Sequence, residues 1–203
     1  MTTTSYLQHL SRDKKLGMIL KEATPVILKR SENICMELCT SIMSQQLSVK
    51  VARVFHQRFI ALLGTEDPSP AQITAITYDQ LRGIGLSHAK ATYVHNVAAF
   101  AASNGMDYKK LDEMSNEEVI DYLTQIKGVG RWTVEMLLMF TMGREDVFSC
   151  DDLGIQHAMI RLYKIDPADK KQLKMKMQKL ASRWAPFRTY ACLHLWKWKD
   201  TGN

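Results

Sequence analysis

The sequence predicts an all-α protein, and three observations support this fold class. Apolar residues recur every three or four positions through most of the 203-residue chain, which is the spacing of one face of a helix. Residues that cap helices, chiefly serines, precede several of these stretches. No segment shows a convincing alternation of apolar and polar residues, as a half-buried strand would. With 46% apolar residues, the chain can bury a core as one domain or as two lobes that share a cleft.

The first half of the chain contains three expected longer helices and one short one. Ser31 can cap a helix that extends to about Met43 with its apolar residues on one stripe. Residues 48–63 continue with apolar residues at helical spacing. Residues 68–70, Pro-Ser-Pro, mark a turn before a short helix, and residues 87–103 form the next long one.

The second half contains five expected helices. Residues 115–126 begin with a capping box, in which Ser115 and Glu118 can each bond the other's backbone N–H. The four further helices are expected at residues 130–142, 152–163, 167–184 and 188–199.

Positive charge is concentrated near the end of the chain. The net charge is +6 and the pI is near 9.1, which favours a polyanionic partner only weakly. Residues 164–199 hold ten Lys or Arg and two acidic residues, a local charge of +8. Such a segment suits a phosphate backbone, but it could equally be the solvated face of a lysine-rich helix.

The cysteine pattern argues against a metal site or disulfide framework. No C-x2-C pair and no cysteine-rich cluster occurs, so we expect free thiols in a reducing compartment, no zinc and no iron–sulfur cluster. The N-terminus lacks an apolar signal core, and no apolar run approaches the length of a membrane span. We therefore expect a cytoplasmic protein, or a nuclear one in a eukaryote, with no membrane partner. The four cysteines are Cys35, Cys39, Cys150 and Cys192.

A glycine-containing turn at residues 126–130 is the first candidate binding site. Gly128 and Gly130 allow a tight hairpin, because glycine accepts positive φ and lets the backbone approach another group closely. The next helix then starts at Gly130 and Arg131, with free N–H groups that can bind a phosphate. Lys127 adds a second positive charge beside the turn. Taken alone, Gly-x-Gly between helices is more often only a turn.

Four motifs in order resemble those of one protein family. Residues 123–133 resemble the helix-hairpin-helix of base-excision DNA glycosylases, and residues 146–154 resemble the Gly/Pro-rich loop and aspartate that follow it, although the proline is absent. Residues 44–48 look like the strand-penetrating loop, and residues 184–196 are similar to the C-terminal signature of the alkylation-repair branch. The resemblance to this helix-hairpin-helix/GPD superfamily covers roughly residues 30–198 and is strongest for the DNA-3-methyladenine glycosylase II type.

The resemblance implies that Asp152 is the catalytic residue. Cleavage of an N-glycosidic bond leaves a sugar with oxocarbenium character, which a carboxylate can stabilise while it also orients the attacking water. A simpler interpretation is that Asp151 or Asp152 only caps the helix that begins near Leu153. We expect both roles to be filled, with Asp151 as the cap and positioning residue beside the substrate pocket.

The resemblance also implies a pocket for the base and a mechanism without a lyase step. Trp132 stands where the lyase branch has a lysine nucleophile, so water is the expected nucleophile and an abasic site the product. Trp132 and Trp196 match aromatic walls on which a cationic alkylated purine can stack. Met136 replaces a tyrosine found lower in that pocket, which leaves the range of substrates open.

Two further DNA contacts follow from the same resemblance. Base flipping leaves a gap in the duplex, and Gln46, with Leu47 beside it, is the candidate wedge that fills it. Without the resemblance, these residues would be read as the polar end of a helix. The main-chain carbonyls of Thr124, Ile126 and Val129 would hold a monovalent cation, Na⁺ or K⁺, that bridges the hairpin to a phosphate.

Together these inferences predict a DNA glycosylase that hydrolyses N3- or N7-alkylated purines from double-stranded DNA as a monomer. We expect a single glycosylase domain over residues 1–203, with one lobe at about 45–140 and the other formed by 1–44 and 141–203. The hairpin and Asp152 would lie at the cleft between the lobes. Two alternatives remain: a non-catalytic helix-hairpin-helix DNA-binding module, and a glycosylase for another damaged base.

Overall fold

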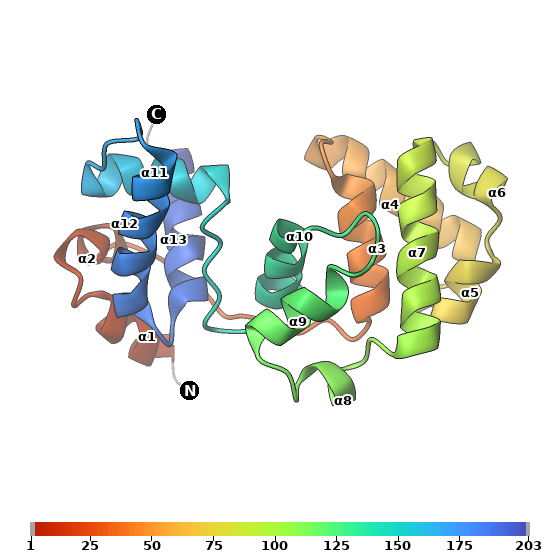
Figure 1. Ribbon diagram of the computed structural model, residues 1–203, viewed down its shortest axis with the longest axis horizontal. Helices are drawn as coiled ribbons and strands as arrows, with labels where there is room; N and C mark the ends of the chain where they lie inside the picture. Colours follow the sequence, from red (N-terminus) through yellow and green to blue (C-terminus); the bar gives the residue numbers. More distant parts are fainter. Residues whose placement is uncertain (1–2, 202–203) are drawn as a thin grey trace. The chain divides into compact units, whose positions relative to one another are not determined.

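The computed structural model describes residues 3–201, and every regular element in this range is helical (Figure 1). The all-α prediction is confirmed. The chain divides into two compact units: unit 2 is Arg30–Leu137, and unit 1 contains the described residues before and after it. The first boundary between the units therefore falls at Arg30, whereas the sequence suggested a boundary near residue 45.

Unit 2 is built around α7, which packs against both α3 and α5. Figure 1 shows α7 lying between α3 and the short helices α5 and α6. Short capped helices make the remaining turns of the unit, and both α5 and α6 begin with a capping box. The helices of unit 2 are α3 (Ile34–Ser44), α4 (Val49–Leu63), α5 (Pro70–Ala75), α6 (Tyr78–Gly83), α7 (His88–Asn104), α8 (Tyr108–Leu111), α9 (Asn116–Leu123) and α10 (Arg131–Met136).

The packing of α3 explains why the expected lobe boundary was wrong. Its apolar stripe, which includes Ile34, Leu38 and Ile42, is fully buried, and its neighbours are α7 and α4 of unit 2. A helix belongs to the core that covers its apolar face. Residues 30–44 therefore fold with the residues that follow them, and the loop after α3 is internal to unit 2.

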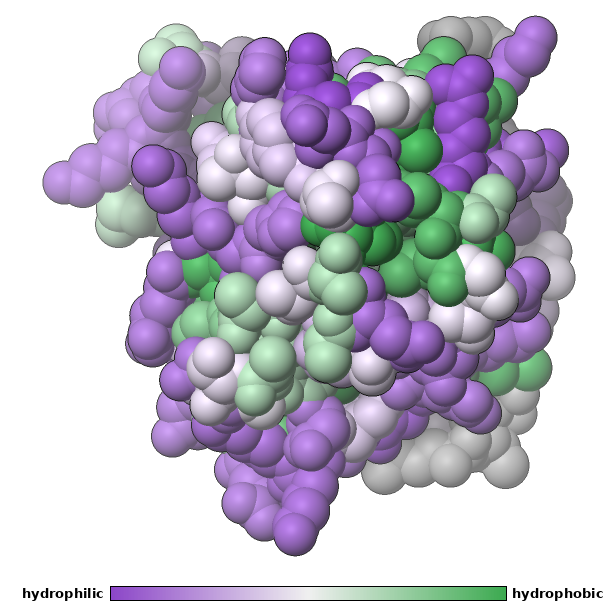
Figure 2. All heavy atoms as spheres, turned by 90° about the vertical axis from the view of Figure 1, so that its right-hand side faces the viewer, coloured by the Kyte–Doolittle hydropathy of each residue, from purple (hydrophilic) through white to green (hydrophobic). Residues whose placement is uncertain are grey.

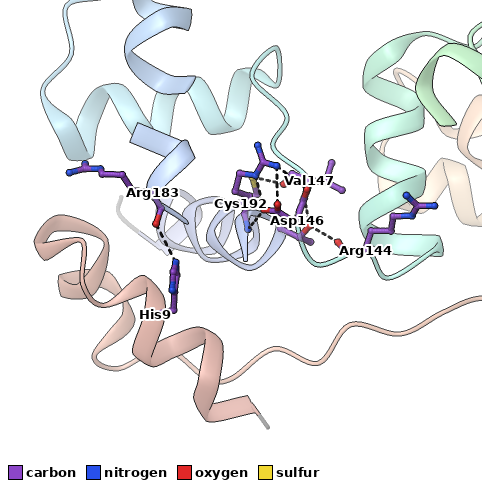
Figure 3. Close-up of polar contacts among 8 residues, drawn as sticks. His9, Arg144, Asp146, Val147, Arg183 and Cys192 are labelled. Carbon is purple, nitrogen blue, oxygen red and sulfur yellow. Dashed lines mark hydrogen bonds and ion pairs between the residues drawn. The ribbon is translucent and has the colours of Figure 1, made fainter. Parts of the chain in front are cut away.

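Unit 1 combines the two ends of the chain. In it α13 packs against both α11 and α2, so a helix from the N-terminal part of the chain shares a core with two from the C-terminal part. Figure 3 shows one such link, in which the imidazole of His9 contacts the main-chain carbonyl of Arg183 at 3.2 Å. The helices are α1 (Thr3–Leu10), α2 (Lys14–Leu20), α11 (Leu153–Tyr163), α12 (Lys170–Ala181) and α13 (Arg188–Thr201), with a 3-10 turn at Ser182–Trp184.

A π-helical segment, Leu137–Thr141, continues α10 and leads into unit 1. The expected helix 130–142 is thus present, but its second half has the wider π turn, a geometry that recurs at functional sites.

The surface of unit 2 at its α5–α7 end is predominantly hydrophilic, with smaller apolar areas between the polar side chains (Figure 2). This agrees with helices whose apolar faces are turned into the core. Among residues 3–201, no helix is both long and apolar enough to cross a membrane.

Candidate functional site

Asp152 is the N-cap of α11 in unit 1. Its Oδ1 accepts a hydrogen bond of 2.8 Å from the backbone N–H of Ile155, and the residue is only 9% exposed. The positive end of the helix dipole stabilises an anion at this position. The fold therefore holds this carboxylate in a fixed orientation at the start of the helix.

Trp196 of α13 provides a second donor to the same carboxylate. Its indole N–H donates a hydrogen bond of 2.8 Å to Oδ1 of Asp152. Close approach depends on Gly154, because a Cβ there would lie 2.9 Å from the indole and 3.0 Å from Oδ1. The structure thus brings together the two residues of unit 1 that the sequence assigned to catalysis and to the base pocket.

Asp151 does not have the role expected of it. Its side chain is 55% exposed and forms an ion pair with Lys174 of α12. The cap of α11 is Asp152 instead. Sequence could not separate the two, because adjacent aspartates before a helix have the same capping preference, and only the backbone direction at the first turn decides between them.

Phe140 is a candidate site residue that sequence reasoning missed. It lies in the π-helical segment, is 55% exposed and stacks on Trp196 with ring centroids 5.9 Å apart. An exposed aromatic beside a carboxylate-bound indole extends the stacking surface next to Asp152. The sequence contained one signal for it: Trp132, Met136 and Phe140 follow one another at intervals of four residues, which places them on one face of a helix.

The loop that leads to Asp152 is held by the start of α13. Arg188 binds Asp146 through two contacts, Nε to Oδ1 at 2.6 Å and Nη2 to Oδ2 at 2.9 Å. Thr189 Oγ1 accepts a hydrogen bond from the N–H of Val147 at 3.0 Å. Figure 3 shows Asp146 and Val147 close to Cys192 of the same helix. The C-terminal signature therefore serves partly as a support for the loop that leads to Asp152.

The glycine hairpin of unit 2 is packed against α7. Gly128 has φ of +105°, and a Cβ there would lie 2.2 Å from the ring of Tyr93. Asn96, also on α7, donates a hydrogen bond of 3.0 Å to the carbonyl of Lys127, whose side chain is exposed. The close approach and the positive φ expected for this turn are both confirmed at Gly128.

The second helix of the hairpin starts as expected, but the charge of Arg131 is compensated. Gly130 is the N-cap of α10 and provides no side-chain cap. The Arg131 guanidinium binds Glu117 at 2.6 Å and the buried Glu135 at 3.0 Å. These carboxylates raise the pKa of Arg131, and the hydrogen bond to Glu117 has the largest effect. Arg131 therefore joins α9 to α10 and does not offer the uncompensated phosphate-binding charge that the sequence suggested.

The remaining predicted DNA-contact and pocket residues also lie in unit 2. Trp132, in the first turn of α10, is 43% exposed, and Met136 one turn later is half-buried. After α3, Gln46 is exposed and has φ of +59°, while Leu47 is half-buried. A residue with a Cβ rarely adopts this backbone conformation, which often marks a functional position.

No side-chain metal site is formed in the part of the chain that the structure describes: no three His, Cys, Asp or Glu residues are grouped to hold an ion. The four cysteines are free thiols, and only Cys150 among them is not buried.

The all-helical fold, the glycine hairpin and the capping aspartate bonded to an indole agree with the class of DNA repair proteins that the sequence resembles. Over residues 39–186 the chain matches the family described as HhH-GPD superfamily base excision DNA repair protein, and it belongs to this family.

Individual relatives agree with this assignment. The chain is 37% identical over 163 residues to DNA-3-methyladenine glycosylase 1 of Schizosaccharomyces pombe. The aligned residues cover 79% of this chain and 70% of the relative. Its fold is similar to the crystal structure of a DNA-3-methyladenine glycosidase from Bacillus halodurans, with a TM-score of 0.84, 34% identity and coverage of 99% and 90% of the two chains. It is also similar to the S. pombe 3-methyladenine DNA glycosylase Mag1 in complex with abasic DNA, with a TM-score of 0.78, 34% identity and 95% coverage of each chain.

Proposed function

We propose that the protein is a monofunctional DNA glycosylase of base excision repair, which acts as a monomer on double-stranded DNA. It hydrolyses the N-glycosidic bond of alkylated purines such as 3-methyladenine. The relatives named as 3-methyladenine glycosylases support this substrate class. The single observation that carries the proposal is the Asp152 carboxylate, held by the N–H groups of Ile155 and Trp196.

The fixed carboxylate accounts for the chemistry. As the bond to the base breaks, positive charge develops on the sugar, and an anion that is already oriented stabilises this charge without having to reorganise. Alkylation makes the purine cationic and thus a good leaving group, so the site needs little acid assistance. The indole of Trp196 and the ring of Phe140 provide a stacking surface beside Asp152, and such a surface favours electron-poor bases.

The DNA-binding parts are supplied by unit 2. The exposed Lys127 and the uncapped start of α10 lie on the hairpin, where phosphate contacts are expected. Gln46 would fill the gap left by the flipped base. Trp132 carries no amine, so the protein should leave an intact abasic strand.

The proposal includes a monovalent cation, Na⁺ or K⁺, at the carbonyls of Thr124, Ile126 and Val129. Such oxygens suit a hard cation, and the Ile126 carbonyl fits because it accepts the Val129 N–H at 3.0 Å with one of its two lone pairs. A bound cation would supply positive charge where a phosphate meets the hairpin.

Asp152→Asn tests the proposed chemistry. Asparagine is an equally good helix cap and keeps an oxygen for the two N–H donors, so the variant should fold while it lacks the charge. A duplex with one N7-methylguanine is incubated with each protein, and free base and alkali-labile sites are measured. We expect the wild type to release the base, with strand breaks only after alkali, and Asp152→Asn to lose at least about a hundred-fold in rate.

Asp151→Asn is the matched comparison, because it removes the same charge one residue earlier at an exposed ion pair. It should retain most of the activity. If the wild type binds DNA but releases no base from any lesion, the protein is a DNA-binding module. Equal activity of Asp152→Asn and the wild type would overturn the assignment of the carboxylate.

A further inference from the structure

The loop after α3 is held in one conformation by contacts from two other helices. Gln45 ends α3 with ψ of 133°, and Gln46 follows with φ of +59°. The Leu47 N–H then returns to the Ser44 carbonyl at 3.1 Å. Since the left-handed region is unfavourable for a residue with a Cβ, this conformation needs support from outside the loop.

Lys90 of α7 provides that support. Its ammonium donates hydrogen bonds to the carbonyl of Met43 at 2.8 Å and to the carbonyl of Gln45 at 2.7 Å. The first carbonyl belongs to the last turn of α3, where carbonyls lack helical partners and carry partial negative charge. The second belongs to the peptide unit that joins Gln45 to Gln46. The ammonium therefore fixes the plane of that peptide unit relative to the helix end.

A second contact holds the same residue from α10. The side-chain amide of Gln45 donates to Thr133 Oγ1 at 3.3 Å, beside Trp132 in the first turn of α10. Gln45 is thus tied to α7 by its carbonyl and to α10 by its amide. Gln46, by contrast, is exposed. The division of roles is clear: Gln45 anchors the loop, and Gln46 projects from it.

We propose that Lys90 is a positioning residue for base flipping: it fixes the Gln45–Gln46 peptide so that Gln46 is presented, already ordered, to the DNA duplex. The inference rests on the proposed glycosylase function. An ordered wedge has lost its conformational freedom before DNA binds, so insertion costs less at the moment of flipping. Lys90 itself contacts main-chain atoms of the protein and need not touch DNA.

A purely structural role for Lys90 predicts a different pattern. If the ammonium only stabilised the fold, its loss would slow excision equally for every lesion context. If it positions the wedge, its loss matters most when flipping is difficult. A lesion in a stable base pair needs the wedge, whereas a mismatched lesion is already partly unstacked and flips more readily.

Lys90→Met tests this difference, because it keeps the aliphatic chain and removes the ammonium. Single-turnover excision of N7-methylguanine is measured opposite cytosine and opposite thymine. Loss of the charge-assisted hydrogen bonds should slow excision opposite cytosine on the order of ten-fold, and opposite thymine by less than about three-fold. Lys90→Arg should recover much of the lost rate. Lys109→Met, at an exposed lysine of α8, is the matched control and should behave as the wild type.

A double-mutant cycle with Gln46→Ala completes the test. Once the Gln46 side chain is absent, Lys90 has no wedge to position, so Lys90→Met should slow excision much less in that background. If Lys90→Met does not fold, Lys90→Gln, which can still bond one carbonyl, carries the same cycle. The inference is overturned if Lys90→Met slows excision equally in both pairing contexts and the effects in the cycle are additive. It is also overturned if Lys90→Met does not slow excision at all. A wild-type protein that releases no base instead overturns the glycosylase proposal, so the two failures are distinguishable.

Discussion

The indole N–H of Trp196 donates a 2.8 Å hydrogen bond to Oδ1 of Asp152, the same oxygen that caps α11. One aromatic side chain therefore both fixes the candidate catalytic carboxylate and offers a face to a ring. Phe140 stacks on that indole. Any change that shifts the indole should alter the carboxylate's orientation as well, so the stacking face and the orientation of Asp152 are coupled through Trp196.

Gly154→Ala should disturb the contact between the Trp196 indole and the Asp152 carboxylate with little change in stability. The new Cβ would lie 2.9 Å from the indole of Trp196 and 3.0 Å from Asp152 Oδ1, so the indole must move. Alanine in the first turn of α11 also favours the helix by up to about 1 kcal/mol, which offsets part of the crowding cost. We expect a small change in Tm but a roughly ten-fold or larger fall in the excision rate, measured under single turnover.

Gly83→Ala is the control for that substitution, since it lies in α6 and a Cβ there meets nothing within 4 Å. It should leave the rate unchanged. Wild-type excision by Gly154→Ala would show that the bond between Trp196 and Asp152 is not needed.

Arg188→Lys should weaken the support of the loop that leads to Asp152. Lysine keeps the charge but cannot reproduce the two contacts of Arg188 with Asp146, at 2.6 and 2.9 Å. Because both side chains are about one-third exposed, we expect a loss of only about 1 kcal/mol in the free energy of unfolding. Urea denaturation should show a lower midpoint with an unchanged m-value.

Arg183→Lys provides the comparison, as Arg183 makes a single 3.2 Å contact with Asp13 and is 60% exposed. Its midpoint should move less than that of Arg188→Lys. The reverse order would mean that the two-point contact does not stabilise the loop.

Sequence predicted the helical architecture well because each long helix carries its own periodicity and caps. The capping box at Ser115 and Glu118, for example, is present as expected. The lobe boundary failed because α3 is amphipathic whichever core covers it, and only tertiary packing places it in unit 2. Helices α1 and α2 are short, and their individual bounds were not predicted.

The candidate site was predicted where local motifs carry it and missed where contacts are long-range. Asp152 and Gly128 stand in recognisable motifs, and in the structure Asp152 is buried and Gly128 has a positive φ. The supporting contacts of Lys90, Phe140 and Tyr93 join segments that are distant in sequence or depend on a π turn. No spacing rule in a single sequence reveals such contacts.

His194 should make stability fall in mild acid. Burial lowers the pKa of His194 to about 4, from an ordinary value of 6.5. Its Nε2 lies 3.2 Å from the hydroxyl of Tyr6, which already accepts the Val26 N–H and can therefore donate to a neutral imidazole. Because the folded pKa is the lower one, the unfolded chain binds more protons between pH 6.5 and 4, and stability falls as the pH drops through this window. The full effect is up to about 3 kcal/mol.

His194→Gln should flatten that dependence between pH 6.5 and 5, measured as the free energy of unfolding in urea. Carboxylates titrate at lower pH, so this interval isolates the imidazole. His157→Gln, at an exposed histidine of α11, should leave the slope as in the wild type. An unchanged slope in His194→Gln would show that the buried imidazole does not control the acid response.

Gly128→Ala should affect both the fold and DNA binding. The Cβ would lie 2.2 Å from the ring of Tyr93, and φ of +105° is unfavourable for any residue with a side chain. Relief requires the hairpin to move away from α7, which should lengthen or break the bond between Asn96 and the Lys127 carbonyl. We expect a loss of about 2–4 kcal/mol in stability and at least about a ten-fold weaker affinity for undamaged duplex DNA.

Gly130→Ala is the matched stability control, because a Cβ at Gly130 meets nothing within 4 Å. In the double variant Gly128→Ala with Tyr93→Ala, the clash is absent and only the backbone strain remains, so the two substitutions should be strongly non-additive. Thermal melting and fluorescence anisotropy measure the two effects separately, and additive losses would show that Tyr93 does not set the position of the hairpin.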